Sequence, residues 1–309
     1  MSRRRLAWLL GVTLLASANG AMASPRLKLA ITIDDLPVHG PTPVNETPQS
    51  IADRTIAALK AAHVDNVTGF VNGRWGVTQP ASMGVVAAWR KAGLPIGNHS
   101  WSHANLGQIG EGELLGELGG NERTLVDYGR GSDWHWFRYP FLAEGQGERR
   151  LVLRRILAER HYRIAAVTMD FSDWQWTAPY ARCVAAKDDR GITELKRLYL
   201  QSAREDIVAR RFLSKELYGR DIPYVLLMHI GALDSYMLPQ LLALYRDAGF
   251  SFVSLKEAER DPVYREDVDP RLPPREATLD GRASERGLAH PQATDFAAKL
   301  AAICPSPTL

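Results

Sequence analysis

The sequence predicts an α/β fold, a barrel of about seven parallel strands. The first observation is that short apolar segments, typical of strands, alternate with amphipathic segments, typical of helices, along most of the chain. The second is that polar residues suited to chemistry follow the predicted strands, whose carboxyl ends meet on one face of a parallel barrel. The length of 309 residues suits one barrel or two smaller domains.

Residues 1–23 are typical of a secretory signal peptide. A basic start at Arg3–Arg5 precedes an apolar stretch over Leu6–Ala16 and a small-residue cleavage site at Ala21–Ala23. The mature protein would begin near Ser24, in the periplasm or outside the cell. The first cysteine is Cys183, which argues against a lipid anchor at the cleavage site. General secretion and twin-arginine export both remain open as routes.

The charge balance gives no reason to expect a nucleic-acid partner. The chain has 38 Lys and Arg against 35 Asp and Glu. The predicted signal peptide contains three of the arginines and no acid, so the mature chain is close to neutral and has no basic tract. Outside the signal core, no apolar run is long enough to span a membrane. We therefore expect no membrane anchor in the mature chain.

The predicted strands are short apolar segments that end at polar or turn-forming residues. Residues 224–229 have the continuous apolar pattern of a buried strand. In chain order the predicted strands are 27–33, 66–71, the stretch leading into His99, 134–138, 163–169, 224–229 and 250–255.

Helical segments are predicted between these strands. Thr47 and Pro48 are typical of an N-cap and a first-turn proline, and they precede a helix with Ile51, Ile56 and Leu59 on its apolar face. Glycines between 112 and 120 weaken the prediction of a helix around 114–125. The further helices expected are one ending near residue 92, one around 114–125, one over 149–160 and one over 238–248.

A longer connection is predicted between residues 177 and 222. Its second half has the apolar periodicity of a helix that ends at Gly219. Its first half, residues 179–191, lacks this periodicity, and we expect it to be irregular.

Residues 259–309 are expected to form a tail on the surface of a single catalytic domain, residues 24–258. The tail is charged and proline-rich as far as Pro291, and it ends in a short amphipathic helix. Cys183 and Cys304 are the only thiols. In an oxidising compartment they could pair and stabilise the fold by roughly 4–5 kcal/mol, or they could be two buried free thiols.

The segment 99–103, with His99 and His103 at its ends, is the centre of the functional prediction. Its two histidines turn toward one point if the backbone between them forms one helical turn. Histidine is the commonest metal ligand, and a catalytic zinc needs a third protein ligand. Asp34 and Asp35, at the end of the first predicted strand, supply a carboxylate. The alternative is two surface histidines and an unrelated aspartate pair in a turn or helix cap.

Other polar residues follow the later strands. Arg138 ends the fourth predicted strand, Asp170 and Asp173 follow the fifth, and His229 ends the sixth. Each alone has a structural explanation, as a surface ion pair, a turn former or a buried histidine. Together they predict one site, because the carboxyl ends of parallel barrel strands converge on the face that forms active sites.

In this order the motifs resemble the five motifs of polysaccharide deacetylases of the NodB-homology type. The resemblance spans residues 27–255 and implies a distorted (β/α) barrel. It also implies a metal-dependent carbohydrate esterase that removes N-acetyl, or less often O-acetyl, groups from a cell-envelope or extracellular polysaccharide or oligosaccharide. The matching segments are Thr32–Asp35, His99–His103, Arg138–Phe141, Asp170–Trp174 and Leu227–His229.

The resemblance implies a metal centre and a base. Asp35, His99 and His103 would bind a divalent ion, for which zinc is expected and cobalt, nickel or iron are alternatives. Asp34 would be the general base, and Arg138 would orient it. A zinc-type ion brings the pKa of bound water to about 7, so that the base can activate this water for amide hydrolysis.

The resemblance also implies an acid and a substrate pocket. His229 would be the general acid that protonates the leaving amine, with Asp173 tuning its pKa. The backbone N–H of Phe141 would stabilise the oxyanion. The expected walls of the pocket are Trp174 and Leu227, around the acetyl methyl group, with Trp101 and Trp176.

The sequence departs from the family pattern in several places. Phe141 replaces a tyrosine that is usual at the end of the third motif, and Ile230 stands where an aspartate is common. The connection from Trp174 to His229 looks long and could cover the groove. His39 follows the first motif and could be a ligand or a substrate contact, although a loop histidine is the simpler interpretation.

Three other functions are compatible with these residues to different degrees. The same fold could hydrolyse a small non-glycan amide, such as a cyclic one. A glycan-binding protein without catalysis would be expected to lack a base, acid or ligand, and none of these is missing here. Two histidines and one aspartate also form the facial triad of an Fe(II) oxygenase, but Asp34, Arg138 and His229 would have no role there. The sequence leaves the oligomeric state open.

Overall fold

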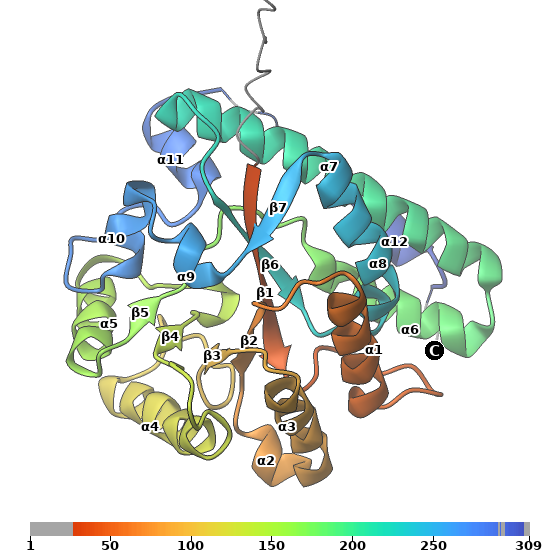
Figure 1. The fold of residues 1–309 in the computed structure, drawn as a ribbon, viewed down its shortest axis with the longest axis horizontal. Coiled ribbons are helices and arrows are strands. Elements are labelled where there is room, and N and C mark those ends of the chain that lie inside the picture. Colours follow the sequence, from red (N-terminus) through yellow and green to blue (C-terminus); the bar gives the residue numbers. More distant parts are fainter. Residues whose placement is uncertain (1–26, 290, 292–293, 306–309) are drawn as a thin grey trace, which may run out of the picture.

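The computed structural model describes residues 27–289, 291 and 294–305, and it has an α/β fold in which helices surround one curled sheet (Figure 1). The predicted signal peptide and its cleavage site lie outside the described residues. Among the described helices, none has the length and apolar character needed to cross a membrane.

The sheet contains seven strands, one at each predicted position. Its order is β5-β4-β3-β2-β1-β6, β7 also pairs with β1, and every pairing is parallel. The strands are β1 (Leu27–Leu36), β2 (Thr68–Val71), β3 (Ile96–Asn98), β4 (Trp136–Phe137), β5 (Arg163–Ile164), β6 (Tyr224–His229) and β7 (Phe250–Val253).

Backbone pairing beyond β5 curls the sheet into a distorted barrel. β5 is shorter than predicted because the chain leaves β4 after Ile164 and crosses to β6. There Met169 forms a parallel bridge with Leu226, and the N–H of Leu227 donates to the carbonyl of Met169. The predicted fold class, an α/β barrel of parallel strands, is therefore confirmed.

β1 is the central strand and contains an irregularity at the first motif. It pairs with β6 as far as Asp34, but its register with β2 shifts between Ile33 and Leu36. Such a bulge re-aims the side chains at the position where it occurs. Asp34 and Asp35 lie in this bulge, so the strand can present two adjacent carboxylates to different partners.

Helices pack around the sheet (Figure 1). Thr47 and Ser50 form the predicted N-terminal cap of α1, since the hydroxyl of Thr47 accepts from the N–H of Ser50 at 3.1 Å. The helices are α1 (Pro48–Ala61), α2 (Trp75–Thr78), α3 (Gly84–Lys91), α4 (Glu111–Tyr128), α5 (Gly147–Glu159), α6 (Thr177–Ala186), α7 (Asp189–Tyr218), α8 (Ala232–Asp247), α9 (Leu255–Ala258), α10 (Arg265–Val268), α11 (Leu279–Glu285) and α12 (Ala297–Ala302). Short 3-10 turns are η1 (Pro80–Met83), η2 (Pro140–Leu142), η3 (Asp173–Trp176) and η4 (Pro262–Tyr264).

The expectation of irregular structure over residues 179–191 is wrong. α6 and the start of α7 occupy this segment, separated by Lys187 and Asp188. Pro179 lies in the first turn of α6, where its missing N–H costs no helical hydrogen bond. Asp188 caps α7 by accepting from the N–H of Gly191 at 2.9 Å. The structure therefore adds α6 and the first turn of α7 to the helix that the apolar periodicity predicted.

The C-terminal segment contributes side chains to the main core. Tyr264, Leu279 and Phe296 are each at most 3% exposed and belong to the same apolar cluster as the strands. Cys183 of α6 and Cys304, just after α12, form a disulfide bond. Of the two alternatives for the cysteines, the structure contains the paired one.

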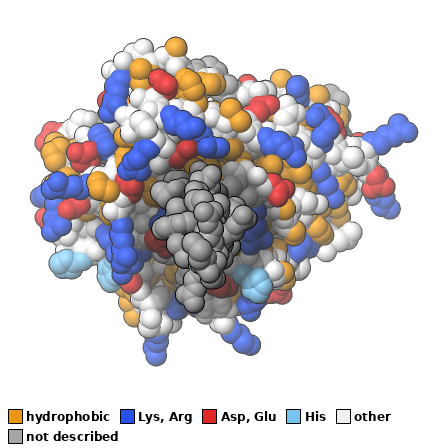
Figure 2. Space-filling model, turned by 45° about the horizontal axis from the view of Figure 1, so that its top comes forward, with side chains coloured by type: hydrophobic (Ala, Val, Ile, Leu, Met, Phe, Trp, Pro, Cys, Tyr) orange, Lys and Arg blue, Asp and Glu red, His pale blue; other side chains and the backbone are white. Residues whose placement is uncertain are grey.

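The described surface has no large region of one charge in the view of Figure 2. There, Lys and Arg side chains are dispersed among acidic and apolar ones. This distribution agrees with the near-neutral charge expected of the mature chain.

We predict that the double variant C183A/C304A unfolds more easily than the wild type. The disulfide links residues 121 positions apart, and closing a loop of this length restricts the unfolded chain. The free energy of unfolding should fall by about 2–5 kcal/mol, measured by urea titration. A reductant should lower the midpoint of the wild type and leave the variant unchanged; equal midpoints for the two proteins would contradict the prediction.

Candidate metal centre and catalytic cavity

A cavity of about 370 Å³ lies at the carboxyl ends of the strands. It brings together residues from all five motifs, which lie far apart in the sequence. The lining residues are Asp34, Asp35, His39, His99, His103, Tyr139, Phe141, Leu142, Asp170, Trp174, Leu227 and His229.

Asp34 and Arg138 form a buried ion pair behind this cavity. Asp34 is 2% exposed, and the Nη1 atom of Arg138 lies 3.3 and 3.2 Å from its two carboxylate oxygens. The guanidinium also donates to Thr32 Oγ1 and to the carbonyl of Ala165, both at 3.1 Å. These bonds fix the guanidinium, and the guanidinium in turn fixes the plane of the Asp34 carboxylate.

Asp35, His99 and His103 form a group that fits a divalent metal. The Oδ1 atom of Asp35 lies 3.4 Å from Nε2 of His99 and 3.4 Å from Nε2 of His103. Two ligand atoms at about 2.1 Å from one tetrahedral ion are themselves about 3.4 Å apart. Asp35 Oδ1 is buried and has no hydrogen-bond partner among the described residues. A cation would satisfy this oxygen.

The orientation of His99 is set by its other ring nitrogen. Nδ1 of His99 donates to the carbonyl of Arg138 at 2.8 Å, which leaves Nε2 as the unprotonated nitrogen that faces Asp35. Burial lowers the pKa of His103, although the nearby carboxylate of Asp35 opposes this shift. The lowered pKa favours the neutral imidazole of His103, the form that binds metals.

The two histidines do not converge through a helical turn, as we had expected. Residues 99–103 form a bend, in which Ser100 (φ 65°) and His103 (φ 61°) have left-handed backbones. Polar contacts hold this bend: Asn72 Nδ2 donates to the carbonyl of His99 at 2.6 Å, and Glu117 accepts from the N–H and the hydroxyl of Ser102. The ring centroids of the two histidines are 4.8 Å apart.

Left-handed backbones at non-glycine residues are concentrated around the cavity. Each costs of the order of 1–3 kcal/mol and persists where surrounding contacts impose it, which is characteristic of functional sites. Within or beside the motif segments they are Asp35, Ser100, His103, Phe141, Leu142 and Ser172.

His229 and Asp173 form the second carboxylate pair of the site. Nδ1 of His229 lies 2.8 Å from Asp173 Oδ1, and the backbone N–H of His229 donates to Asp173 Oδ2 at 2.6 Å. Burial alone would lower the pKa of His229, but Asp173, with smaller effects of Asp35 and Asp34, raises it to about 10. The histidine is therefore protonated at neutral pH, and its Nε2 is free of the Asp173 contact.

The predicted wall residues have different positions. Phe141 and Trp174 line the cavity and remain 67% and 49% exposed, whereas Leu227 is a buried part of the wall. The ring of Phe141 packs edge-on against His103, with centroids 4.5 Å apart. Trp101 lines a neighbouring cavity of about 430 Å³ that shares Asp35 and His103 with the first.

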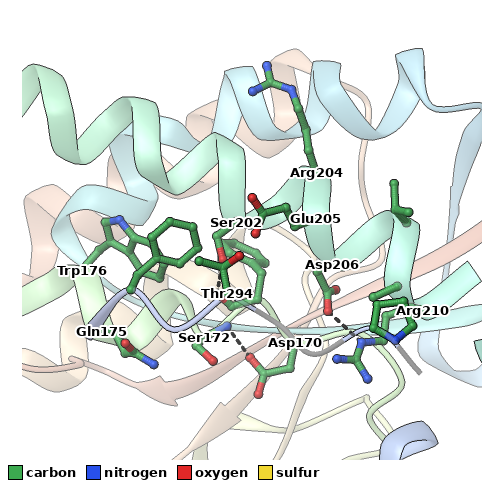
Figure 3. A pocket seen from close by; sticks show the side chains of 15 residues that line it. Asp170, Ser172, Gln175, Trp176, Ser202, Arg204, Glu205, Asp206, Arg210 and Thr294 are labelled. Carbon is green, nitrogen blue, oxygen red and sulfur yellow. Dashed lines mark hydrogen bonds and ion pairs between the residues drawn. The ribbon is translucent and has the colours of Figure 1, made fainter. Parts of the chain in front are cut away.

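Trp176 does not line the catalytic cavity, which corrects our expectation. It is 1% exposed and packs against Tyr199 and Phe296. Figure 3 shows it in another cavity of about 400 Å³, beside α7 and the C-terminal segment. Of that cavity's lining, only Asp170 also faces the catalytic cavity, and burial raises the pKa of this carboxyl.

His39 lies in the cavity and not in a remote loop. Its Nδ1 is 2.6 Å from Asp35 Oδ2, and its ring centroid is 4.5 Å from that of His229. Burial would raise the pKa of Asp35, but the hydrogen bond with His39 and the nearby histidines hold it well below its usual range. The spacing of four residues from Asp35 was the available signal, but it could not show that the chain turns back.

The barrel and its cavity, with buried carboxylates and histidines at the strand ends, have the architecture of an enzyme with its active site at the carboxyl ends of the strands. A family model for polysaccharide deacetylases matches residues 22–177, half of the chain. The chain therefore belongs to the polysaccharide deacetylase family, a family of hydrolases that act on N-acetyl groups. A comparison with curated proteins found no match.

Solved structures of this class have the same fold. One is a mutant, with restored enzymatic activity, of BA3943, a CE4 family pseudoenzyme from Bacillus anthracis (18% identity, TM-score 0.53, 76% of this chain and 68% of that chain). Another is the CE4 domain of a multidomain xylanase from the hindgut metagenome of Trinervitermes trinervoides (14%, 0.52, 83% and 99%). A third is a mutant of the peptidoglycan deacetylase PdaC from Bacillus subtilis (19%, 0.50, 78% and 96%). At these identities the similarity shows the fold alone.

We predict that R138M destabilises the protein strongly. The substitution leaves the Asp34 carboxylate buried without its counter-charge and leaves several acceptors of the guanidinium unpaired. The free energy of unfolding should fall by about 3–5 kcal/mol, because an uncompensated buried charge is expensive. Urea titration at pH 7 measures the change. The double variant R138M/D34N should recover part of the lost free energy of unfolding. A loss below about 1 kcal/mol for R138M alone would contradict the prediction.

Proposed function

We propose that this protein is a divalent-metal-dependent deacetylase that removes acetyl groups, mainly N-acetyl, from a cell-envelope or extracellular polysaccharide. The observation that supports this best is the arrangement of one cavity: a buried carboxylate, Asp34, and a histidine paired with a carboxylate, His229, line it together with Asp35, His99 and His103. Amide hydrolysis needs a base, an acid and an electrophile, and this cavity offers candidates for all three.

Asp35, His99 and His103 would hold the metal. When bound there, a zinc-type ion would polarise the acetyl carbonyl and acidify a water molecule. Two imidazoles and one carboxylate suit zinc, and cobalt, nickel or iron(II) can use the same ligands.

Asp34 would act as the general base. Its Oδ2 lies 3.7 Å from Nε2 of His99. Asp34 is therefore next to the three candidate metal ligands but is not one of them. Arg138 orients this carboxylate from behind, which leaves it able to accept a proton on the cavity side. The proton removed would be that of the water that attacks the acetyl carbon.

His229 would act as the general acid. The amine of a cleaved amide leaves only after protonation, and the contact with Asp173 keeps His229 protonated at neutral pH. The two proposed proton-transfer groups have different partners, since a guanidinium faces Asp34 and a carboxylate faces His229. The backbone N–H of Phe141 would contribute to oxyanion stabilisation.

The exposed aromatic rings favour a glycan over a small enclosed amide. Phe141 and Trp174 line the cavity but have large solvent-accessible surfaces. Aromatic faces of this kind pack against the apolar faces of sugar rings, and an enclosed small substrate would not require them at the surface. Leu227 would contact the acetyl methyl group, as proposed from the family motif.

We further propose that the protein acts in the periplasm or outside the cell. The predicted signal peptide is the primary reason. The disulfide between Cys183 and Cys304 supports it, because structural disulfides form and persist in oxidising compartments.

We predict metal-dependent acetate release by the purified mature protein from at least one of chitooligosaccharides, peptidoglycan and acetylated xylan. A chelator should abolish release and added zinc should restore it. D34N should lower kcat by about 10²–10⁴, because the variant loses the general base while its amide can still contact Arg138. The exposed variant D53N on α1 is the control and should behave as wild type.

Release without metal, or at wild-type rate from D34N, would refute this mechanism. If metal-loaded protein released acetate from none of the polymers, the small-amide hydrolase and the glycan-binding protein would become the better hypotheses.

We predict that D173N moves the alkaline limb of the kcat/KM profile to lower pH. Protonated His229 is the active form, so activity is lost as pH rises through its pKa. The Asp173 carboxylate raises that pKa, so its removal must lower it. Profiles of both proteins at saturating metal test this. An alkaline limb that stays in place or moves upward would exclude His229 as the acid tuned by Asp173.

A further inference from the structure

His39 is a polar side chain of the cavity to which the proposed mechanism gives no role. It lies in the loop that follows β1, and its backbone N–H approaches the carbonyl of Ile230, just after β6, at 3.4 Å. Its side chain is 18% exposed. The loop is thus tied to the end of the neighbouring strand, and the imidazole is held between Asp35 and His229.

The side chain of His39 contacts one particular oxygen of Asp35. Nδ1 lies 2.6 Å from Oδ2, a short hydrogen bond of the charge-assisted type. The other oxygen, Oδ1, faces Nε2 of His99 and His103 and has no hydrogen-bond partner among the described residues. The two oxygens of Asp35 therefore have different partners: Oδ2 contacts His39, and Oδ1 faces the two candidate metal-binding histidines.

The distance between His39 Nδ1 and Asp35 Oδ2 indicates a hydrogen bond and not two ligands of one metal ion. Asp35, His39 and His229 also form a group whose ligand atoms lie within 4.8 Å of one another. Atoms that share one tetrahedral ion are, however, about 3.4 Å apart. The 2.6 Å between His39 and Asp35 leaves no room for an ion between them. Through Nδ1, His39 is therefore a hydrogen-bond partner of Asp35 and does not share an ion with Oδ2.

The backbone of Asp35 has an unusual conformation. Asp35 has a left-handed backbone (φ 64°) within the bulge of β1. This conformation is unfavourable for a residue with a side chain and must be maintained by surrounding contacts. Without a bond to Oδ2, the carboxylate could rotate partway about χ2, and the lone pairs of the oxygen that faces His99 and His103 would change direction.

We propose that His39 is a positioning residue for the metal centre: its Nδ1–H holds Oδ2 of Asp35, so that Oδ1 faces His99 and His103. This inference rests on the proposed role of Asp35 as a metal ligand. Hydrogen bonds to ligating side chains typically contribute 10–100-fold to metal affinity. His39 therefore contributes to how tightly the ion is held, without contact to the ion.

The test compares H39L with H39N in the full mature chain. Asparagine carries an N–H donor at the position of the histidine Nδ1, whereas leucine has nearly the same shape and no donor. Both variants lose the ring contact with His229, so their difference reports the hydrogen bond alone. Zinc affinity and stoichiometry are measured by competition with a chromophoric chelator, without substrate, and thermal unfolding of the metal-free proteins checks the fold.

We expect H39L to bind zinc 10–100-fold more weakly than wild type and H39N to remain within about threefold of it. All three proteins should bind one ion per chain in the cavity and unfold at similar temperatures without metal. Equal affinities of H39L and H39N would overturn the proposal, and so would a second ion in the wild type that both variants lose.

The zinc-binding test of His39 can fail or succeed independently of the acetate-release test of the proposed function. A wild-type protein that binds zinc but releases no acetate contradicts the deacetylase proposal and leaves the comparison of the His39 variants valid. A wild-type protein that binds no divalent ion contradicts both proposals.

Discussion

The buried ion pair of Arg138 with Asp34 is the interaction on which the rest of the site depends. Arg138 is fully buried and donates to Asp34 and Thr32 of β1 and to carbonyls that follow β5, while its own carbonyl accepts from Nδ1 of His99. One residue thus holds the proposed base, orients a metal-ligand candidate and links β1 to the backbone that follows β5. A charge buried this deeply is tolerated only when its bonds are complete, so the surrounding elements are held to one arrangement.

The same constraint extends into the C-terminal segment. The carboxylate of Glu259 accepts from the N–H of Ala166 at 2.6 Å, and the carbonyl of Ala166 lies 3.4 Å from Nη2 of Arg138. Glu259 is buried, and burial raises the pKa of its carboxyl well above the usual value. The segment beyond β7 is therefore more than a covering of the barrel, because it holds the backbone that in turn holds Arg138.

The barrel alone does not decide whether a member of this family is catalytic, since one similar structure is described as a pseudoenzyme. What distinguishes an active site is the environment of individual groups. Here one carboxylate, Asp34, is paired with a guanidinium, and another, Asp173, is paired with a histidine. The first arrangement suits a proton acceptor and the second a proton donor. The proposed catalysis therefore depends on these two pairs and not on the fold.

The sequence by itself determined the positions of the strands, the cap at Thr47 and the convergence of the motifs, because apolar periodicity, capping and strand ends are local features. Only the tertiary structure decided the bend between His99 and His103, the burial of Trp176, the pairing of Cys183 with Cys304 and the contact of His39 with Asp35. Each of these depends on how the chain packs or turns back on itself. Contacts that depend on a left-handed backbone or on side-chain packing between distant segments leave no periodic pattern in the sequence.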